Sequence, residues 1–130
     1  MKKKDSLCQC GSKLLSAKCC LPFIREEANP PTPEALMRSR YTAYALQEEA
    51  YLLNTWAENN RPTPPLLEQQ EETLKWINLK IIRSSATTDA GIVEFVATYK
   101  VNGKAYKLHE VSNFQKVNGQ WYYTDGTVAE

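Results

Sequence analysis

The chain has 130 residues, of which 42% are hydrophobic, enough for one folded domain with a substantial core and a small additional segment. Its 16 basic and 15 acidic side chains leave a net charge of +1, which argues against broad electrostatic capture of nucleic acid or of a membrane surface. The lysines near the N-terminus are not followed by an apolar stretch, and no stretch approaches the ~18 apolar residues of a membrane span. We therefore expect a soluble cytoplasmic protein in which thiols stay reduced.

All four cysteines lie within one short segment, at Cys8, Cys10, Cys19 and Cys20. A disulfide gains most by closing a long loop, so this clustering favours a metal site over a disulfide framework. Four thiolates suit a tetrahedral Zn²⁺ ion, and a segment this short has no core of its own, so metal binding would supply its folding free energy. The spacing differs from the usual pair of cysteines two residues apart, so redox thiols and disulfides remain alternatives.

A linker and helices are predicted after the cysteines. Residues 21–33 are rich in proline and read as a linker of restricted flexibility. A helix can begin at Thr32 or Pro33, because proline suits the first helical turn and apolar residues then recur at helical spacing. Residues 48–56 predict a continuation of this helix or a second one, and residues 66–74 are amphipathic enough for another short helix.

Four strands follow the predicted helices. Residues 76–84 alternate in character and should place Ile77, Leu79 and Ile81 on one face. Residues 92–125 then contain three strands, because two Asn-Gly pairs are strong signals for two-residue hairpin turns of type I′. The register that these turns fix pairs Phe95 with Glu110, Tyr99 with Tyr106, Ser112 with Asp125, and Phe114 with Tyr123. Helices followed by an antiparallel sheet predict an α+β domain whose helices cover the apolar sheet face.

Polar residues converge at one end of that apolar face, which is typical either of a ligand cavity or of a core with an internal charge pair. Arg40 shares a helical stripe with Tyr44 and is the cation best placed to point toward the sheet. A buried pair between Arg40 and Glu110 that locks helix to sheet is the first interpretation, and a ligand-binding role of the same two residues is the second. The candidate pocket residues are Arg40, Tyr44, Glu110, Ser112 and Asp125.

The motifs of common catalytic sites are missing from the sequence. His109, the only histidine, should face the opposite side of the sheet from Glu110, since neighbouring strand residues point apart, so the two cannot form a dyad. The sequence contains no glycine-rich phosphate loop and no nucleophile elbow. We therefore predict no catalytic residue, and whether the protein is an enzyme stays open.

The cysteine segment resembles the SEC-C motif, the zinc-binding segment named for the C-terminus of the SecA translocation ATPase. The resemblance lies in Cys8-Gln9-Cys10-Gly11-Ser12 followed by Cys19-Cys20. It implies that the four cysteines are zinc ligands, that Gly11 forms a tight turn and that Ser12 is a hydrogen-bonding turn residue. Lys13 departs from the pattern, because many members carry a second glycine there.

Most of the remaining chain resembles the YchJ-like family, which combines a SEC-C motif with an NTF2-like domain, a cone of bent sheet and helices. The resemblance is carried by residues 34–46, Trp56, residues 108–114, residues 121–123 and Asp125-Gly126. It implies a zinc knuckle in residues 1–25 and an NTF2-like domain in residues 32–128. Many members carry a second cysteine cluster at the C-terminus, and this chain ends at Glu130 without one.

Two functions are consistent with these observations. The first is a protein-interaction module in which the zinc knuckle recruits a partner, because residues 1–25 carry six basic side chains and only one acidic one. The second is a small-molecule binder or enzyme that uses the interior of the cone, which a cavity of a few hundred Å³ would favour. Sheets of the NTF2-like fold often form dimers, so a homodimer through the sheet is a further expectation. We also expect zinc removal to unfold residues 8–20 and to leave the larger domain intact.

Overall fold

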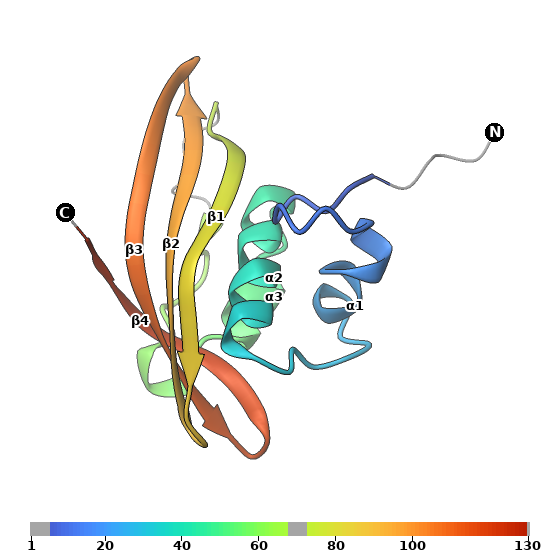
Figure 1. The fold of residues 1–130 in the computed structure, drawn as a ribbon, viewed down its shortest axis with the longest axis vertical. Helices are drawn as coiled ribbons and strands as arrows, with labels where there is room; N and C mark the ends of the chain where they lie inside the picture. Colours follow the sequence, from blue (N-terminus) through green and yellow to red (C-terminus); the bar gives the residue numbers. More distant parts are fainter. Residues whose placement is uncertain (1–5, 68–72, 130) are drawn as a thin grey trace.

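The computed structural model describes residues 6–67 and 73–129. The helical elements are η1 (Ser16–Lys18), α1 (Leu21–Ile24), α2 (Pro33–Leu46), α3 (Glu49–Asn54) and η2 (Glu58–Asn60). The strands β1 (Lys75–Ala86), β2 (Ala90–Val101), β3 (Lys104–Val117) and β4 (Gln120–Val128) form one antiparallel sheet in chain order. Helices α2 and α3 lie on the concave side of this curved sheet, and the N-terminal segment with α1 lies on the far side of α2 (Figure 1). The predicted α+β class is confirmed.

Helix α2 begins and ends where its sequence directs. The Thr32 side chain accepts a hydrogen bond from the Ala35 N–H at 3.0 Å, and Pro33 occupies the first turn. Gln47 ends the helix in the left-handed conformation, with φ of 61°. The predicted start is confirmed, and α3 is a separate helix. The linker prediction for residues 21–33 missed α1, and the short helix expected in residues 66–74 falls largely on residues 68–72, outside the described part of the chain.

Both predicted hairpin turns are confirmed. Asn102 and Asn118 have φ of 53° and 52°, and the glycine that follows each also has positive φ, as a type I′ turn requires. The pairing between β2 and β3 follows the predicted register without interruption. The turn chemistry therefore decided which side chains of β2 and β3 face the helices.

The pairing between β3 and β4 departs from the prediction because β4 contains a bulge. Phe114 faces Tyr123 as expected, but Asn113 faces Asp125 and Ser112 faces Gly126. Thr124 is the extra residue, and its hydroxyl donates a hydrogen bond to the Asn113 carbonyl at 2.9 Å. The predicted opposition of Ser112 and Asp125 is wrong, because one inserted residue moves every later side chain to the other face.

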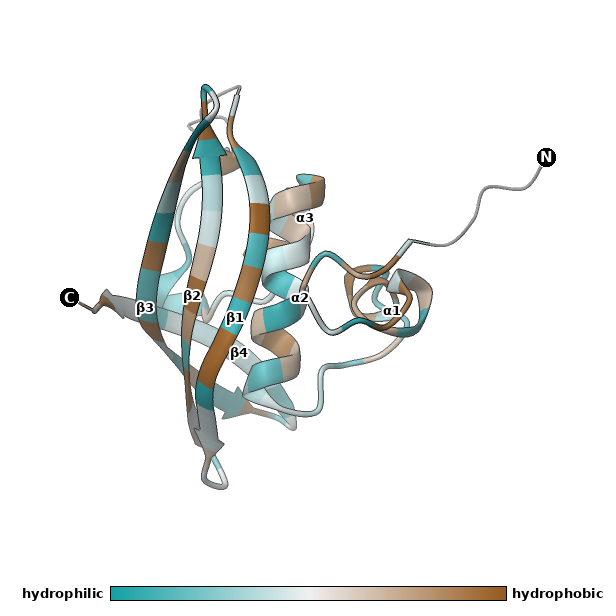
Figure 2. Cartoon of the chain, turned by 45° about the horizontal axis from the view of Figure 1, so that its top comes forward, coloured by the Kyte–Doolittle hydropathy of each residue, from teal (hydrophilic) through white to brown (hydrophobic). Residues whose placement is uncertain are grey.

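Strand β1 is also irregular. A register shift between Trp76 and Asn78 leaves Ile77 50% exposed, so the prediction that Ile77 shares a face with Leu79 and Ile81 is wrong. Trp76 takes the inward position instead, with its ring centroid 5.6 Å from that of Tyr41. Bands of hydrophobic and hydrophilic residues alternate along β1 and β2 in Figure 2, as expected for strands with one buried face.

The cysteine segment shares the core of the larger domain. Cys8, Cys10 and Cys20 belong to the same buried cluster as Leu36 of α2 and Leu79 of β1. This packing argues against the expectation that the segment and the domain behave as separate folding units. In the described part of the chain, no helix is long and apolar enough to cross a membrane.

Candidate functional site

The four cysteines come together in a tight cluster. Their Sγ atoms all lie within 4.8 Å of one another, and Cys19 Sγ is 3.6 Å from Cys10 Sγ and 3.8 Å from Cys20 Sγ. Zn–S bonds of about 2.3 Å in a tetrahedron place the sulfur atoms about 3.8 Å apart. The donor set therefore fits a metal ion of this kind, with Cys8, Cys10 and Cys20 buried and Cys19 half-buried.

Two left-handed residues shape the loop that carries the first two cysteines. Gly11 and Lys13 have φ of 81° and 71°, and the Cys8 N–H donates to the Leu14 carbonyl at 2.7 Å across the loop. Glycine adopts such φ values freely, whereas a residue with a Cβ atom does so only with steric strain. The structure thus explains both the role predicted for Gly11 and the glycine that SEC-C motifs often carry at the position of Lys13.

Hydrogen-bond donors surround the sulfur atoms. Ser12 Oγ lies 3.1 Å from Cys19 Sγ, as expected for a turn residue of this motif, and Thr42 Oγ1 lies 3.7 Å from Cys8 Sγ. Arg38 Nη1 lies 3.7 Å from Cys10 Sγ and donates to the Cys10 carbonyl at 2.8 Å. Such contacts orient thiolate ligands and stabilise their negative charge.

The thiols are too crowded to ionise together without a cation. Burial raises the pKa of Cys19 to about 11, and contact with Cys10 and Cys8 raises the pKa of Cys20. Hydrogen bonds with Cys10 and Cys20 lower the pKa of Cys8, so one thiolate forms more readily than its neighbours. A bound divalent cation would offset this repulsion and allow all four thiolates to form.

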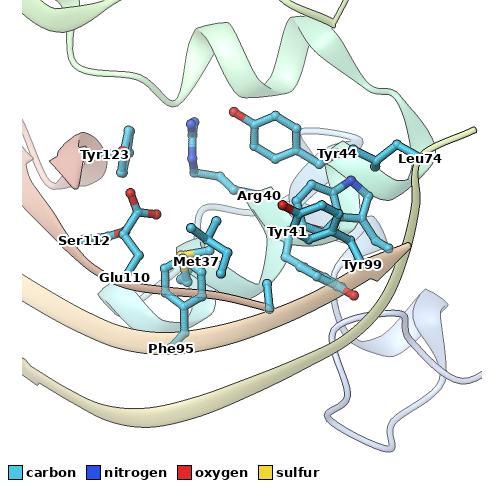
Figure 3. Close-up of a pocket in the computed structure, with 13 residues that line it drawn as sticks. Met37, Arg40, Tyr41, Tyr44, Leu74, Phe95, Tyr99, Glu110, Ser112 and Tyr123 are labelled. Atoms are coloured by element: carbon cyan, nitrogen blue, oxygen red, sulfur yellow. The ribbon is translucent and has the colours of Figure 1, made fainter. Parts of the chain in front are cut away.

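A cavity of about 430 Å³ lies between α2 and the concave face of the sheet. Its wall is largely aromatic, with Trp76 between Tyr41 and Tyr99 at centroid distances of 5.6 and 5.4 Å. The polar groups lie toward the other end, where Arg40, Glu110, Ser112 and Tyr123 line the cavity (Figure 3). Pockets for small ligands have volumes of roughly 300–1,000 Å³ and this combination of apolar walls and few polar groups.

Arg40 is a buried cation that has no anionic partner among the described residues. Its side chain is 3% exposed, and Nη1 donates to the Leu52 carbonyl and to Thr55 Oγ1, each at 2.7 Å. Its guanidinium carbon lies 4.9 Å from the ring centroid of Trp56 and 4.6 Å from that of Tyr123. Burial lowers the pKa of Arg40, and no carboxylate of the described residues forms an ion pair with it.

Glu110 is a half-buried carboxyl group, and it too has no cationic partner in the described part of the chain. Burial raises its pKa, and neither an ion pair nor a hydrogen bond to it occurs among the residues described. Its carboxyl group lies close to Gly126, where a Cβ atom would approach Glu110 Cδ to 2.8 Å. The interpretation that Arg40 and Glu110 form a buried pair is therefore wrong, although both line the cavity together with Tyr44 and Ser112.

Asp125 lies outside the cavity. The bulge in β4 turns it to the outer face of the sheet, where it is exposed and accepts a hydrogen bond from Asn113 Nδ2 at 2.8 Å. His109 also faces outward, as predicted, with Nε2 2.7 Å from Glu94 Oε2. Glu94 Oε1 in turn accepts from Arg83 Nε at 2.7 Å, so His109 belongs to a surface network.

Sequence reasoning missed two features of these sites. It assigned no role to Arg38, whose contact with Cys10 spans 28 residues of the chain. It also missed the attachment of residues 55–57 to the edge of β4, where the Ala57 N–H donates to the Tyr123 carbonyl at 2.7 Å. This attachment brings Trp56 over Arg40, and no periodicity in the sequence signals it.

Comparison with known proteins places the chain in a family. A family model described as the YchJ middle NTF2-like domain matches residues 32–126. A UPF0225 protein of Chromobacterium violaceum is 46% identical, over 98% of this chain and 97% of that protein. A UPF0225 protein of Cupriavidus metallidurans is 44% identical, over 95% of this chain and 89% of that protein.

Solved structures agree with this assignment. The solution structure of a SEC-C motif containing protein from Rhodopseudomonas palustris matches with a TM-score of 0.89 and 33% identity, over 96% of this chain and all of that one. The crystal structure of a SEC-C motif containing protein from Psychrobacter arcticus has the same fold, with a TM-score of 0.80 and 24% identity, over 98% of this chain and 84% of that one. The chain therefore belongs to the YchJ-like family of SEC-C motif proteins with an NTF2-like domain.

Proposed function

We propose that this protein binds a small organic molecule in the cavity between α2 and the sheet. The observation that carries the proposal is a cavity of about 430 Å³ whose polar end holds a buried guanidinium and a carboxyl group that do not pair with each other. A core that served stability alone would be filled, or would pair its charges, because an unpaired buried charge is costly. Polar groups held apart in an apolar pocket are typical of ligand recognition.

A pocket-filling variant tests this function. Ala97 is 1% exposed and lines the cavity, so Ala97→Leu should occupy part of the volume. Ala105→Leu, at an exposed position of β3, is the matched control. Saturation-transfer NMR with a library of small aromatic compounds should show binding to wild type and to Ala105→Leu, and loss of binding to Ala97→Leu. Absence of binding to wild type, or equal binding to all three proteins, would refute the proposal.

We propose further that the metal of the cysteine cluster is zinc and that it has a structural role. Four thiolates at tetrahedral spacing suit Zn²⁺, and a site closed by four protein ligands leaves no open position for a substrate. The burial of Cys8, Cys10 and Cys20 in the shared core supports a structural role. In this proposal zinc holds the N-terminal segment against α2, which forms one wall of the cavity.

Recruitment of a protein partner by the N-terminal segment is a second candidate function. Leu7, Leu14 and Leu15 are 62%, 54% and 37% exposed, and Leu7 and Leu15 pair across a β-bridge. Exposed leucines beside Lys13 and Lys18 suit an acidic partner with an apolar contact surface. A partner captured from a bacterial lysate should be lost with Leu14→Ser and released by salt, while Ile77→Ser, at an exposed leucine-sized residue of β1, should keep it. A captured protein that is unaffected by both Leu14→Ser and salt would count against this role.

A further inference from the structure

We infer that the ligand of the cavity is a small organic carboxylate with a flat apolar body, and that its carboxylate group pairs with Arg40. The inference rests on the proposed binding function and names the chemical class of the ligand. It depends on three observations. Arg40 has N–H groups that can still donate hydrogen bonds, Glu110 has a raised pKa, and aromatic residues line the end of the cavity opposite the polar groups.

Arg40 is the first observation. The guanidinium has five N–H groups; Nη1 donates to the neutral oxygens of Leu52 and Thr55, and a hydrogen bond with the Tyr44 side chain also favours the charged form of Arg40. The side chain is 97% removed from solvent, yet no carboxylate in residues 6–67 or 73–129 forms an ion pair with it. The guanidinium carbon lies 4.9 Å from the Trp56 ring centroid and 4.6 Å from that of Tyr123, and the two rings stand at 83° to each other, so both restrict its position; N–H groups of its planar fork remain for another acceptor. A carboxylate matches that geometry with two parallel hydrogen bonds.

Glu110 is the second observation, because an ionised carboxylate beside Arg40 would oppose a second anion. The charged and titratable groups that act on this region are Arg40 and Tyr44 on α2, Tyr51 on α3, and Tyr123 and Asp125 on β4. None of them forms an ion pair or a hydrogen bond with Glu110 within the described chain, and burial raises its pKa. A neutral carboxyl group can donate a hydrogen bond to the carboxylate of a ligand.

The shape and lining of the cavity are the third observation. Trp76 lies between Tyr41 and Tyr99 in the lining of the cavity, with ring centroids 5.6 and 5.4 Å apart. Figure 3 shows Tyr41 and Tyr99 at the end of the cavity away from Glu110 and Ser112. A small inorganic anion would leave this apolar part of the cavity unused, whereas a flat ring fills it with stacking contacts.

Three probes with the same body test the class of the ligand. 2-Naphthoate, 2-naphthamide and 2-naphthylmethylammonium carry an anionic, a neutral and a cationic group on one ring system. Binding is measured by isothermal titration and located by amide chemical shifts of Ala97, Tyr99 and Glu110. The carboxylate should bind at least about tenfold more tightly than the amide, and the ammonium compound should bind weakest, because only the carboxylate pairs with a guanidinium.

Two variants separate the residues involved. Arg40→Met should abolish the preference for the carboxylate over the amide, and Arg83→Met, on the outer sheet face, should leave it unchanged. Glu110→Gln keeps a neutral hydrogen-bond donor at its position, so it should retain carboxylate binding. Binding to wild type should weaken as the pH rises through the pKa of Glu110, and Glu110→Gln should remove this dependence. If Arg40→Met does not fold, the Glu110→Gln measurements still test the inference.

The outcomes distinguish the inference from the function on which it rests. Equal or tighter binding of the amide or ammonium probe at the same cavity residues would overturn the carboxylate assignment and leave a ligand-binding cavity. Carboxylate preference that survives in folded Arg40→Met would also overturn it. Absence of cavity shifts with all three probes, together with a negative library screen, would refute the binding function itself.

Discussion

Arg38 on α2 donates a hydrogen bond to the backbone carbonyl of Cys10 at 2.8 Å, and the same Nη1 lies 3.7 Å from Cys10 Sγ. One face of α2 therefore holds the cysteine cluster, while Met37, Arg40, Tyr41 and Tyr44 of the same helix line the cavity. The Glu34 carboxylate, 3.0 Å from Arg38 Nε, orients the guanidinium. This helix links the two candidate sites of the protein.

Replacement of Arg38 should weaken both stability and metal binding. Arg38→Met removes a charged donor from a buried carbonyl and should lower the free energy of unfolding by about 1–3 kcal/mol. Competition with a zinc chelator should show that the affinity of the protein for zinc falls about tenfold, as is typical when a residue that hydrogen-bonds a metal ligand is replaced. Arg83→Met is the control and should change stability by less than about 0.5 kcal/mol, since its ion pair with Glu94 is exposed. Equal effects of the two variants would contradict this role of Arg38.

Metal content should be about one equivalent of zinc per chain when the protein is purified without chelator. Because the cysteines share the core with α2 and β1, metal removal should lower the thermal midpoint of the whole domain, not only that of residues 8–20. Elemental analysis checks the first statement, and thermal unfolding followed by far-UV circular dichroism checks the second. Reduced protein that contains no zinc and has four reactive thiols would contradict the metal assignment.

Glu110→Gln should affect stability in a pH-dependent way. Burial raises the pKa of Glu110 in the folded state, so between the unfolded and folded pKa values the folded protein binds more protons than the unfolded chain. The stabilising contribution of the protonated carboxyl is complete below the unfolded pKa and is lost as the pH rises through the folded pKa. Urea unfolding should therefore show Glu110→Gln more stable than wild type at about pH 7, with a smaller difference at about pH 4. A marked loss of stability at neutral pH would show that Glu110 has a cationic partner in solution.

Arg40→Met should cost little stability or increase it slightly. The substitution removes a buried charge that has no anionic partner in the part of the chain that the structure describes, and it keeps an apolar side chain of similar length, so we expect a change within about 1 kcal/mol. Arg38→Met should cost more, although Arg38 is more exposed, because Arg38 has anionic and sulfur partners. Urea unfolding of both variants provides the comparison. A large loss for Arg40→Met would mean that its bonds to Leu52 and Thr55 are chiefly structural.

Gly91→Ala should be destabilising because Gly91 lies against the start of α2. A Cβ atom there would overlap Pro33 Cγ and lie 3.2 Å from the Ser85 carbonyl oxygen, so β2 and α2 would have to separate. We expect a loss of about 1–3 kcal/mol, as for other overpacked sites. Replacing Pro33 by Ala in the same chain should recover part of this loss, and a double-mutant cycle measures the coupling. If the two changes in the free energy of unfolding simply add, the contact between the new Cβ atom and Pro33 does not cause the loss.

Local signals in the sequence determined much of the architecture. The two Asn-Gly pairs fixed both hairpin turns and the register of β2 with β3, because type I′ geometry is set by the two turn residues alone. Thr32 and Pro33 fixed the start of α2 in the same local way. The cysteine spacing identified the candidate metal cluster, since four cysteines so close in the chain have little freedom to separate.

Only the tertiary structure decided how the polar residues of the cavity relate to one another. One bulged residue in β4 placed Asp125 outside the cavity. A bulge needs only one extra residue in a strand, so the local sequence does not reveal it. The attachment of residues 55–57 to β4 brought Trp56 to Arg40, whose Nη1 donates to the Leu52 carbonyl and not to Glu110. Local propensity fixes turns and helix ends, whereas the partner of a buried charge depends on contacts between distant segments, and these form only when the whole chain packs.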